Sequence, residues 1–128
     1  MRNIFIKKLT EEAKKNKNIY LLTGDLGYNS FEEFASMFPN QFINCGVAEN
    51  NMVGISSGLA LTGKKVFVYS IIPFLIFRSL EQIRNNICHN NLDVKIIGGG
   101  GGAVKLDILV VAPTCCKTCV PPPLLTEI

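Results

Sequence analysis

The sequence has little that would carry the protein into or across a membrane. Only 18% of its 128 residues are charged and 48% are hydrophobic, the balance of one globular domain. Its N-terminus lacks an apolar stretch followed by small residues, so we expect no secretory signal. The longest apolar run, Val66–Phe77, is interrupted by Ser70 and Pro73, which argues against a membrane span. We therefore expect a cytoplasmic protein with no membrane partner.

The sequence also lacks the features of a nucleic-acid-binding surface. The net charge of +3 comes mostly from lysines of the N-terminal segment, namely Lys7, Lys8, Lys14, Lys15 and Lys17. Clustered arginines and interleaved aromatic residues do not accompany these lysines. We interpret them as the solvated face of a helix and expect no nucleic acid as partner.

Metal and phosphate motifs are scarce as well. The glycine run 98–102 lacks the Lys-Ser/Thr pair of a P-loop. Cys116 and Cys119 form a single Cys-x-x-Cys pair beside a triple proline, too few ligands for a structural zinc ion, although a zinc or redox site stays the alternative. We expect no metal ligands in this chain, and we expect Cys45 and Cys88 to be buried, reduced thiols.

The chain does have a regular alternation of helical and strand patterns. Apolar residues at steps of three and four predict helices, and short runs of apolar residues, many of them β-branched or aromatic, predict strands. The predicted helices cover residues 2–17, 30–38, 48–61 and 73–90, and the predicted strands cover 19–22, 42–44, 65–69 and 94–97. Ser30 and Glu33 have the spacing of a capping box. This order predicts an α/β fold, a mainly parallel sheet with helices on both faces.

Loops at the carboxyl ends of the predicted strands are the candidate binding sites, because ligands bind there in open α/β sheets. One such loop, 44–49, ends in Glu49, the only carboxylate at a strand-to-helix junction beside a glycine. An acid at this place either complements the helix dipole or serves a chemical function.

The residues around Glu49 carry a family resemblance. Gly46–Ile55 (Gly-Val-Ala-Glu-Asn-Asn-Met-Val-Gly-Ile), followed by Gly58–Gly63 (Gly-Leu-Ala-Leu-Thr-Gly), is similar to the segment of transketolases and 1-deoxyxylulose-5-phosphate synthases in which a glutamate opens a helix facing the cofactor. The spacing to Ser70 and to Pro73–Arg78 fits the same pattern. Residues 1–102 thus resemble part of the pyrimidine-binding domain of the transketolase superfamily, most closely the C-terminal subunit of split transketolases.

The resemblance implies thiamine diphosphate as cofactor and assigns site residues. Glu49 is implied as the catalytic residue that binds the pyrimidine N1′, promoting the imino form that removes the thiazolium C2 proton. Phe74 and Phe77 are implied to wall the pyrimidine ring, with core packing as the alternative. Asp25 resembles a family aspartate bordering the active site, although a simple turn would also explain its segment.

Arg78 and Glu81 also match the family pattern, and a structural ion pair on or near the helix is an equally good interpretation of both. His89 lies beside asparagines at a predicted helix end, where we expect a surface or capping residue.

The family's diphosphate and magnesium site lies in a separate domain or subunit, and no Gly-Asp-Gly motif with a following Asn occurs here. The implied reaction is transfer of a two-carbon ketol unit between sugar phosphates, and the implied partner is a diphosphate-binding subunit in a homo- or hetero-oligomer. We expect no activity from this chain alone. The alternatives are a fragment of a 1-deoxyxylulose-5-phosphate synthase or of a 2-oxoacid decarboxylase beta subunit, and a non-catalytic remnant.

The resemblance stops after the glycine run, so we expect the domain to be incomplete at its C-terminal end. The family continues to a Pro-Thr-His segment, whereas here Pro113-Thr114 is followed by Cys115-Cys116. We interpret residues 103–128 as a non-family tail, frameshifted or disordered, in which Ile108–Val111 is still able to pair as a strand.

Overall fold

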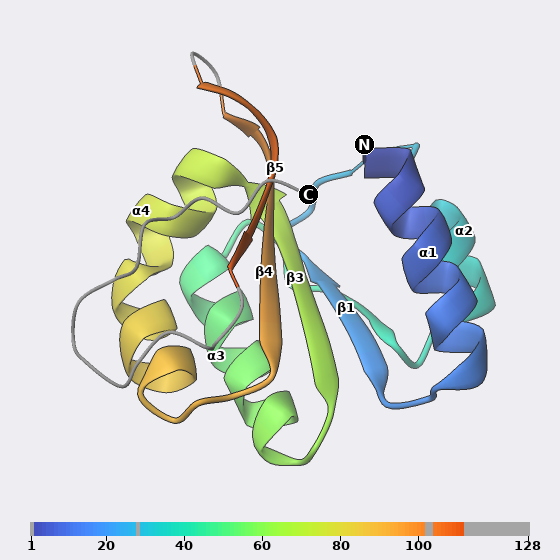
Figure 1. Cartoon of the computed structure of the whole chain (residues 1–128), viewed down its shortest axis with the longest axis horizontal. Coiled ribbons are helices and arrows are strands. Elements are labelled where there is room, and N and C mark those ends of the chain that lie inside the picture. The colour runs from blue at the N-terminus through green and yellow to red at the C-terminus, as the bar shows by residue number, and fades with distance from the viewer. Residues whose placement is uncertain (1, 28, 102–103, 112–128) are drawn as a thin grey trace.

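A computed structural model describes residues 2–27, 29–101 and 104–111 of the chain (Figure 1). The elements are α1 (Arg2–Lys15), β1 (Ile19–Thr23), α2 (Glu32–Met37), β2 (Phe42–Asn44), α3 (Glu49–Leu61), β3 (Lys65–Ile71), α4 (Ile72–Gln82), the π-helical segment η1 (Ile83–Cys88), β4 (Val94–Gly101) and β5 (Val104–Val111). The predicted order of helices and strands is confirmed.

One sheet organises the molecule, with strand order β2-β1-β3-β4-β5. The first four strands run parallel, and β5 is antiparallel to β4. Helices α1 and α2 lie on one face of the sheet, and α3 and α4 lie on the other (Figure 1). The predicted fold class, a mainly parallel sheet covered on both faces, is therefore confirmed.

Neighbouring residues of a strand point to opposite faces, and this alternation builds two cores. Leu21 of β1 packs in a cluster with Ile6 and Phe34 from the α1 and α2 layer. The next residue, Leu22, packs with Met52 and Leu75 from the α3 and α4 layer. Both faces of the central strands are thus buried, which explains their nearly continuous apolar sequence.

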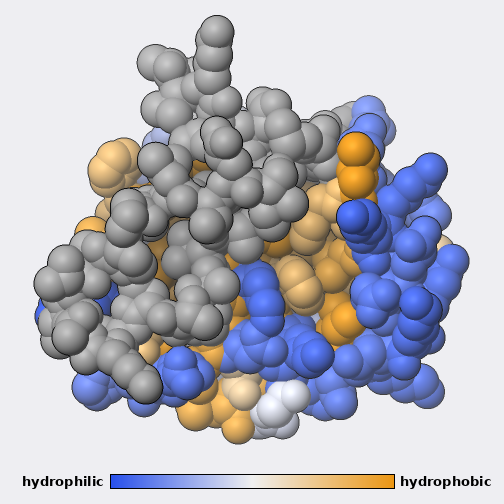
Figure 2. Space-filling model, in the orientation of Figure 1, coloured by the Kyte–Doolittle hydropathy of each residue, from blue (hydrophilic) through white to orange (hydrophobic). Residues whose placement is uncertain are grey.

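The N-terminal helix is amphipathic. Its residues Ile6, Leu9 and Ala13 are buried, with at most 6% of each exposed. The predicted solvated lysines are exposed in the structure, and Lys14 and Lys15 occupy the last turn, where positive charge stabilises the helix dipole. The surface over α1 and α2 is mostly hydrophilic (Figure 2).

The predicted capping box at the start of α2 is wrong. The N-cap residue is Phe31, it has no side-chain cap, and the hydroxyl oxygen of Ser30 is buried without a hydrogen-bond partner. Instead, the backbone N–H of Asn29 donates to Glu32 at 2.7 Å. Backbone N–H groups, chiefly those of Glu32 and Asn29, lower the pKa of the Glu32 carboxyl group.

The predicted long helix 73–90 is divided. Ser79 has non-helical angles (φ −121°, ψ 15°), and residues 83–88 form a π-helical segment. Two glycines of β4 lie close to neighbouring elements: a Cβ atom on Gly98 would collide with Ile72, the first residue of α4, and one on Gly99 would collide with Tyr69. The glycine run therefore gives α4 room to begin directly at the sheet.

Strand β5 pairs with β4 from Gly101–Val104 to Ile96–Val111, so the predicted pairing of Ile108–Val111 is confirmed. The cysteine and proline part of the predicted tail, including Cys116 and Cys119, lies outside the described residues. None of the described helices is long and apolar enough to cross a membrane.

Candidate functional site

The candidate site lies at the carboxyl end of the sheet, between β1 and β3. The chain leaves β1 toward α2 on one face and leaves β3 toward α4 on the other (Figure 1). A crevice forms where neighbouring parallel strands send their connections to opposite faces, and this is the usual ligand site of open α/β sheets. The first residue of α3, Glu49, stands at this point.

Glu49 is an almost fully buried carboxylate, with 2% of the residue exposed. Its Oε1 accepts a hydrogen bond from the Ser70 hydroxyl at 3.2 Å. Its Oε2 accepts one from Nη1 of Arg78 at 3.0 Å, so that the two side chains form an ion pair. Both oxygens therefore have partners, which reduces the cost of burying the charge. The N-terminus of α3 adds a favourable dipole.

The loop after β1 comes close to the carboxylate at Gly24. A Cβ atom on Gly24 would lie 3.4 Å from the carbonyl oxygen of Gly46, 3.7 Å from Glu49 Oε1 and 3.7 Å from Ser70 Oγ. The loop after β1 therefore passes directly beside the ion pair. Gly46 itself has φ +68°, a conformation that favours glycine in the turn leading to Glu49.

Arg78 is held from two sides. While its Nη1 donates to Glu49, its guanidinium carbon lies 4.1 Å from the centre of the Phe74 ring, one helical turn earlier. The Arg78 side chain is 48% exposed, so this charge reaches both the buried carboxylate and solvent. The ion pair expected at Arg78 therefore exists, and its partner is Glu49 rather than a residue of its own helix.

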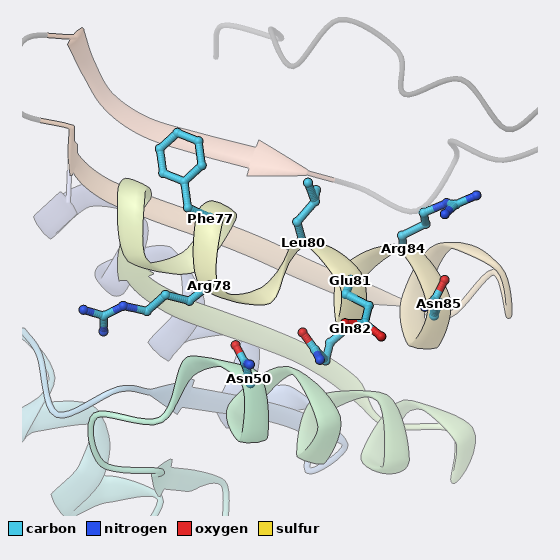
Figure 3. A pocket seen from close by; sticks show the side chains of 8 residues that line it. All are labelled: Asn50, Phe77, Arg78, Leu80, Glu81, Gln82, Arg84 and Asn85. Carbon is cyan, nitrogen blue, oxygen red and sulfur yellow. The ribbon is translucent and has the colours of Figure 1, made fainter.

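Phe77, the second predicted ring-wall residue, is 83% exposed. It borders an open hollow of about 420 Å³ between α4 and α3 (Figure 3). The residues that line this hollow are Asn50, Phe77, Arg78, Leu80, Glu81, Gln82, Arg84 and Asn85. Phe77 and Arg78 leave α4 in different directions in this view, and Asn50 comes from the facing helix (Figure 3). The hollow thus combines exposed apolar and charged groups next to the Glu49 pair.

Asp25 lies in a different environment. It has φ +59°, its carboxylate accepts from the Asn44 amide at 3.0 Å, and its backbone N–H donates to the Asn44 side chain at 3.0 Å. Both residues line a second hollow of about 250 Å³ at the ends of β1 and β2. Among the described residues, no hydrogen bond joins Asp25 to Glu49. The structure therefore brings Glu49 and Phe74 together through Arg78, whereas the hydrogen bonds of Asp25 go to Asn44.

No group of three or more His, Cys, Asp and Glu side chains among the described residues is placed to hold a metal ion. Cys45 and Cys88 are half-buried against the core rather than fully buried, which corrects the prediction for both. Burial raises the pKa of the Cys45 thiol.

Sequence reasoning found Glu49 but missed how it is held. Ser70 stood in a loop singled out for its position, yet its hydroxyl was not expected to meet the carboxylate. The signal for Arg78 was available: it follows Phe74 by four residues, the distance at which side chains meet on one helical face. What the sequence could not show is that α4 faces the start of α3.

Comparison with known proteins identifies relatives. The sequence profile of the family described as "Transketolase, pyrimidine binding domain" matches residues 1–106. The chain is 43% identical over 102 residues to an apulose-4-phosphate transketolase subunit of Phocaeicola vulgatus, a match that covers 79% of this chain and 33% of that protein. It is 32% identical over 105 residues to the 1-deoxy-D-xylulose-5-phosphate synthase of Fusobacterium nucleatum, covering 81% of this chain and 17% of that protein.

A solved structure described as "Split gene transketolase, inactive beta4 tetramer" matches with a TM-score of 0.66 at 39% identity, over 72% of this chain and 31% of that chain. The chain spans about a third of the length of its transketolase relatives. The profile match covers most of the chain, and the fold agrees with that of the structural relative. The chain belongs to the family of transketolase pyrimidine-binding domains.

Proposed function

We propose that this chain is the pyrimidine-binding part of a thiamine-diphosphate-dependent transketolase-type enzyme, which transfers a two-carbon ketol unit between sugar phosphates. One observation carries the proposal: Glu49, 2% exposed, lies at the crevice between β1 and β3 with its Oε2 bound to a half-exposed arginine. A buried ion pair adds little to stability compared with apolar packing. Its presence at a ligand crevice therefore favours a chemical role.

The described residues fit the cofactor's pyrimidine end. Thiamine diphosphate, when bound, supplies a carbon nucleophile that accepts the ketol unit. Glu49 would hold or share a proton at Oε2, because Oε1 is engaged with the buried hydroxyl of Ser70 whereas Oε2 faces a partner that reaches solvent. Gly24 keeps the crevice narrow without filling it.

Two aromatic residues would contact the flat ring. Phe74 is half-buried beside the Glu49 pair, and Phe77 is exposed and borders the neighbouring hollow. An exposed phenylalanine is unfavourable unless a ligand or partner covers it, and Leu80, 59% exposed, extends the same apolar surface. Asp25 as a cofactor contact stays a prediction, since its carboxylate is bound to Asn44 in the second hollow.

The remainder of the site would come from other chains. We propose a separate diphosphate-binding subunit that holds the diphosphate and magnesium, assembled with this chain in an oligomer in the cytoplasm. In support, the Phocaeicola relative is named as one subunit of its transketolase, and the structural relative is called a split-gene transketolase.

The main alternative within the superfamily is a part of a 1-deoxyxylulose-5-phosphate synthase or of a 2-oxoacid decarboxylase beta subunit. The relation to the Fusobacterium synthase keeps the first of these open, while the higher identity to a transketolase subunit favours ketol transfer. A non-catalytic remnant is the remaining alternative. A neighbouring gene that encodes a Gly-Asp-Gly motif with a following Asn would favour an enzyme subunit over a remnant.

Glu49→Gln tests the proposal in a chimera. The matching 102 residues of this chain replace their counterpart in the Phocaeicola transketolase subunit, and the chimera is assembled with that enzyme's partner subunit. Glutamine keeps the size and one acceptor oxygen, but its NH2 group can neither accept from Arg78 nor share the proton. Hydrogen–deuterium exchange at the cofactor C2 should slow by at least about 10²-fold.

Glu81→Gln is the matched control for this experiment, because Glu81 is an exposed carboxylate in the hollow beside the site. It should exchange at the parental rate. Equal exchange rates for Glu49→Gln and the parent at saturating cofactor would mean that Glu49 only complements the dipole of α3. This result would contradict the proposed function.

A further inference from the structure

We propose that Arg78 is a gate at the cofactor site: its guanidinium is bound to Oε2 of Glu49 and must leave this oxygen when the pyrimidine ring binds. The inference rests on the proposed function, because it takes the aminopyrimidine of thiamine diphosphate as the incoming ligand. Arg78 is thus a positioning residue that acts through Glu49.

The geometry of the pair suits an exchangeable contact. The carboxylate is fixed: Glu49 is 2% exposed, begins α3 and is bound by Ser70 through Oε1. The guanidinium is held less tightly, since the Arg78 side chain is 48% exposed and bonds only through Nη1 to Oε2 at 3.0 Å. Any displacement would therefore move the arginine and leave the glutamate in place.

The Phe74 ring gives the arginine a second support. The guanidinium carbon lies 4.1 Å from the ring centre, so the side chain lies over the face of the aromatic residue implied to border the pyrimidine. Arg78 thus covers both groups that the ring would use, the Phe74 face and Oε2 of Glu49. Arginine and ring cannot hold both groups at once.

The ion pair with Arg78 and the bound pyrimidine ring make opposite demands on Oε2 of Glu49. Oε2 accepts the Nη1–H of Arg78 at 3.0 Å, whereas sharing a proton with a ring nitrogen requires the same oxygen to carry or donate one. Among the described side chains, Arg78 is the one cation paired with Glu49. The pair therefore stabilises the fold at the expense of cofactor affinity.

The pair is tested first without cofactor, by urea unfolding of the full 128-residue chain followed by far-UV circular dichroism, since the chain has no tryptophan. Arg78→Met keeps the length and the contact with Phe74 but removes the charge. The equilibrium constant for unfolding should rise about tenfold, because a buried carboxylate loses its counter-ion. In a Glu49→Gln background the same change should have less than half this effect on a logarithmic scale.

Cofactor affinity then separates a gate from a purely structural ion pair. Thiamine diphosphate with magnesium is titrated into the chimera assembled with its partner subunit, carrying either the parent sequence, Arg78→Met or the control Arg84→Met, which removes the same charge from a residue lining the same hollow. Arg78→Met should bind about two- to fivefold more tightly than the parent, the range expected for loss of a partly exposed competing pair. Arg84→Met should not bind more tightly.

Unchanged or weaker binding by Arg78→Met, with binding by the parent intact, would overturn the gate and leave the proposed function standing. Absence of binding by every variant at millimolar cofactor would overturn the gate and count against the proposed function as well. Equal effects of Arg78→Met on unfolding in both backgrounds would show that the pair with Glu49 does not form in solution, which also overturns the gate.

Discussion

At the scale of single residues, the protein keeps one ionised group almost completely out of water and surrounds it with donors. A carboxylate without partners would be costly in the interior, and here Ser70 and Arg78 each satisfy one oxygen of Glu49. The two donors differ in exposure, since Ser70 is 0% exposed and the Arg78 side chain 48%. One side of the carboxylate is therefore structural and the other faces the ligand crevice.

Ser70→Ala should destabilise the fold because it leaves Oε1 of Glu49 with one donor fewer. We expect a loss of about 1–3 kcal/mol in the free energy of unfolding, the cost of a buried polar group without its partner. Urea unfolding followed by circular dichroism measures this loss.

The matched control for Ser70→Ala is Ser57→Ala, which removes a buried hydroxyl that only donates back to Gly54 within α3. It should change stability by less than about 0.5 kcal/mol, since alanine is the better helix former. Equal losses in both variants would mean that the bond to Glu49 adds nothing specific.

Residue-scale reasoning from the sequence singled out Glu49 because it stands at a strand-to-helix junction within a segment that resembles the transketolase superfamily, and its catalytic role stays a prediction. It failed at Ser30, where the spacing to Glu33 suggested a capping box but the chain turns so that Asn29 bonds to Glu32 instead. Local spacing fixes which residues are able to meet within one helix. It does not fix the path of the loop that enters the helix.

At the scale of elements, the position of Arg78 depends on how the start of α4 packs against β4. Strand β3 passes into α4 without a loop, and the start of α4 lies against Gly98 of β4. Apolar periodicity predicted one helix over 73–90 but could not predict the break at Ser79 or the π-helical segment, because the spacing of apolar residues does not specify backbone angles. Strand positions were predicted well, since β1 and β3 are buried on both faces.

Gly98→Ala should destabilise the protein by about 1–3 kcal/mol, the range of an overpacked core. The added methyl group would collide with the Ile72 side chain and lie 3.3 Å from its Cα atom, so the backbone of α4 would have to shift. Circular dichroism during urea unfolding measures the loss.

Gly58→Ala is the control for Gly98→Ala: it is an exposed helical glycine with nothing within 4 Å of the added atom, and it should stabilise by about 0.5–1 kcal/mol. A neutral result for Gly98→Ala would show that α4 tolerates displacement. Close packing against α4 would then not be the reason for the glycine run.

At the scale of the whole molecule, the chain places the Glu49 ion pair beside an exposed apolar surface. Phe77 and Leu80 are both exposed on α4 next to the Glu49 pair, and a surface of this kind is expected to be covered by another chain. The predicted boundary at residue 102 stays a prediction: the family profile reaches residue 106, and β5 joins the same sheet from residue 104. The sequence indicated that Ile108–Val111 is able to pair as a strand, but it could not show that pairing with β4 begins at residue 104, because the extent of an edge strand depends on its partner rather than on local pattern.

The unmodified chain, purified alone and supplied with thiamine diphosphate, magnesium and sugar phosphates, should show no measurable ketol transfer. It spans about a third of the length of its transketolase relatives, and the groups that would hold the diphosphate are expected on another subunit. An acid at one end of a cofactor provides little catalysis unless the reacting end is held in position as well. A coupled assay of the sugar phosphate products measures the rate.

The positive control is the chimera with the Phocaeicola transketolase subunit, assembled with its partner subunit under the same conditions. Turnover by the isolated chain would contradict the incomplete site, whereas turnover by the assembled chimera alone would agree with a site divided between subunits.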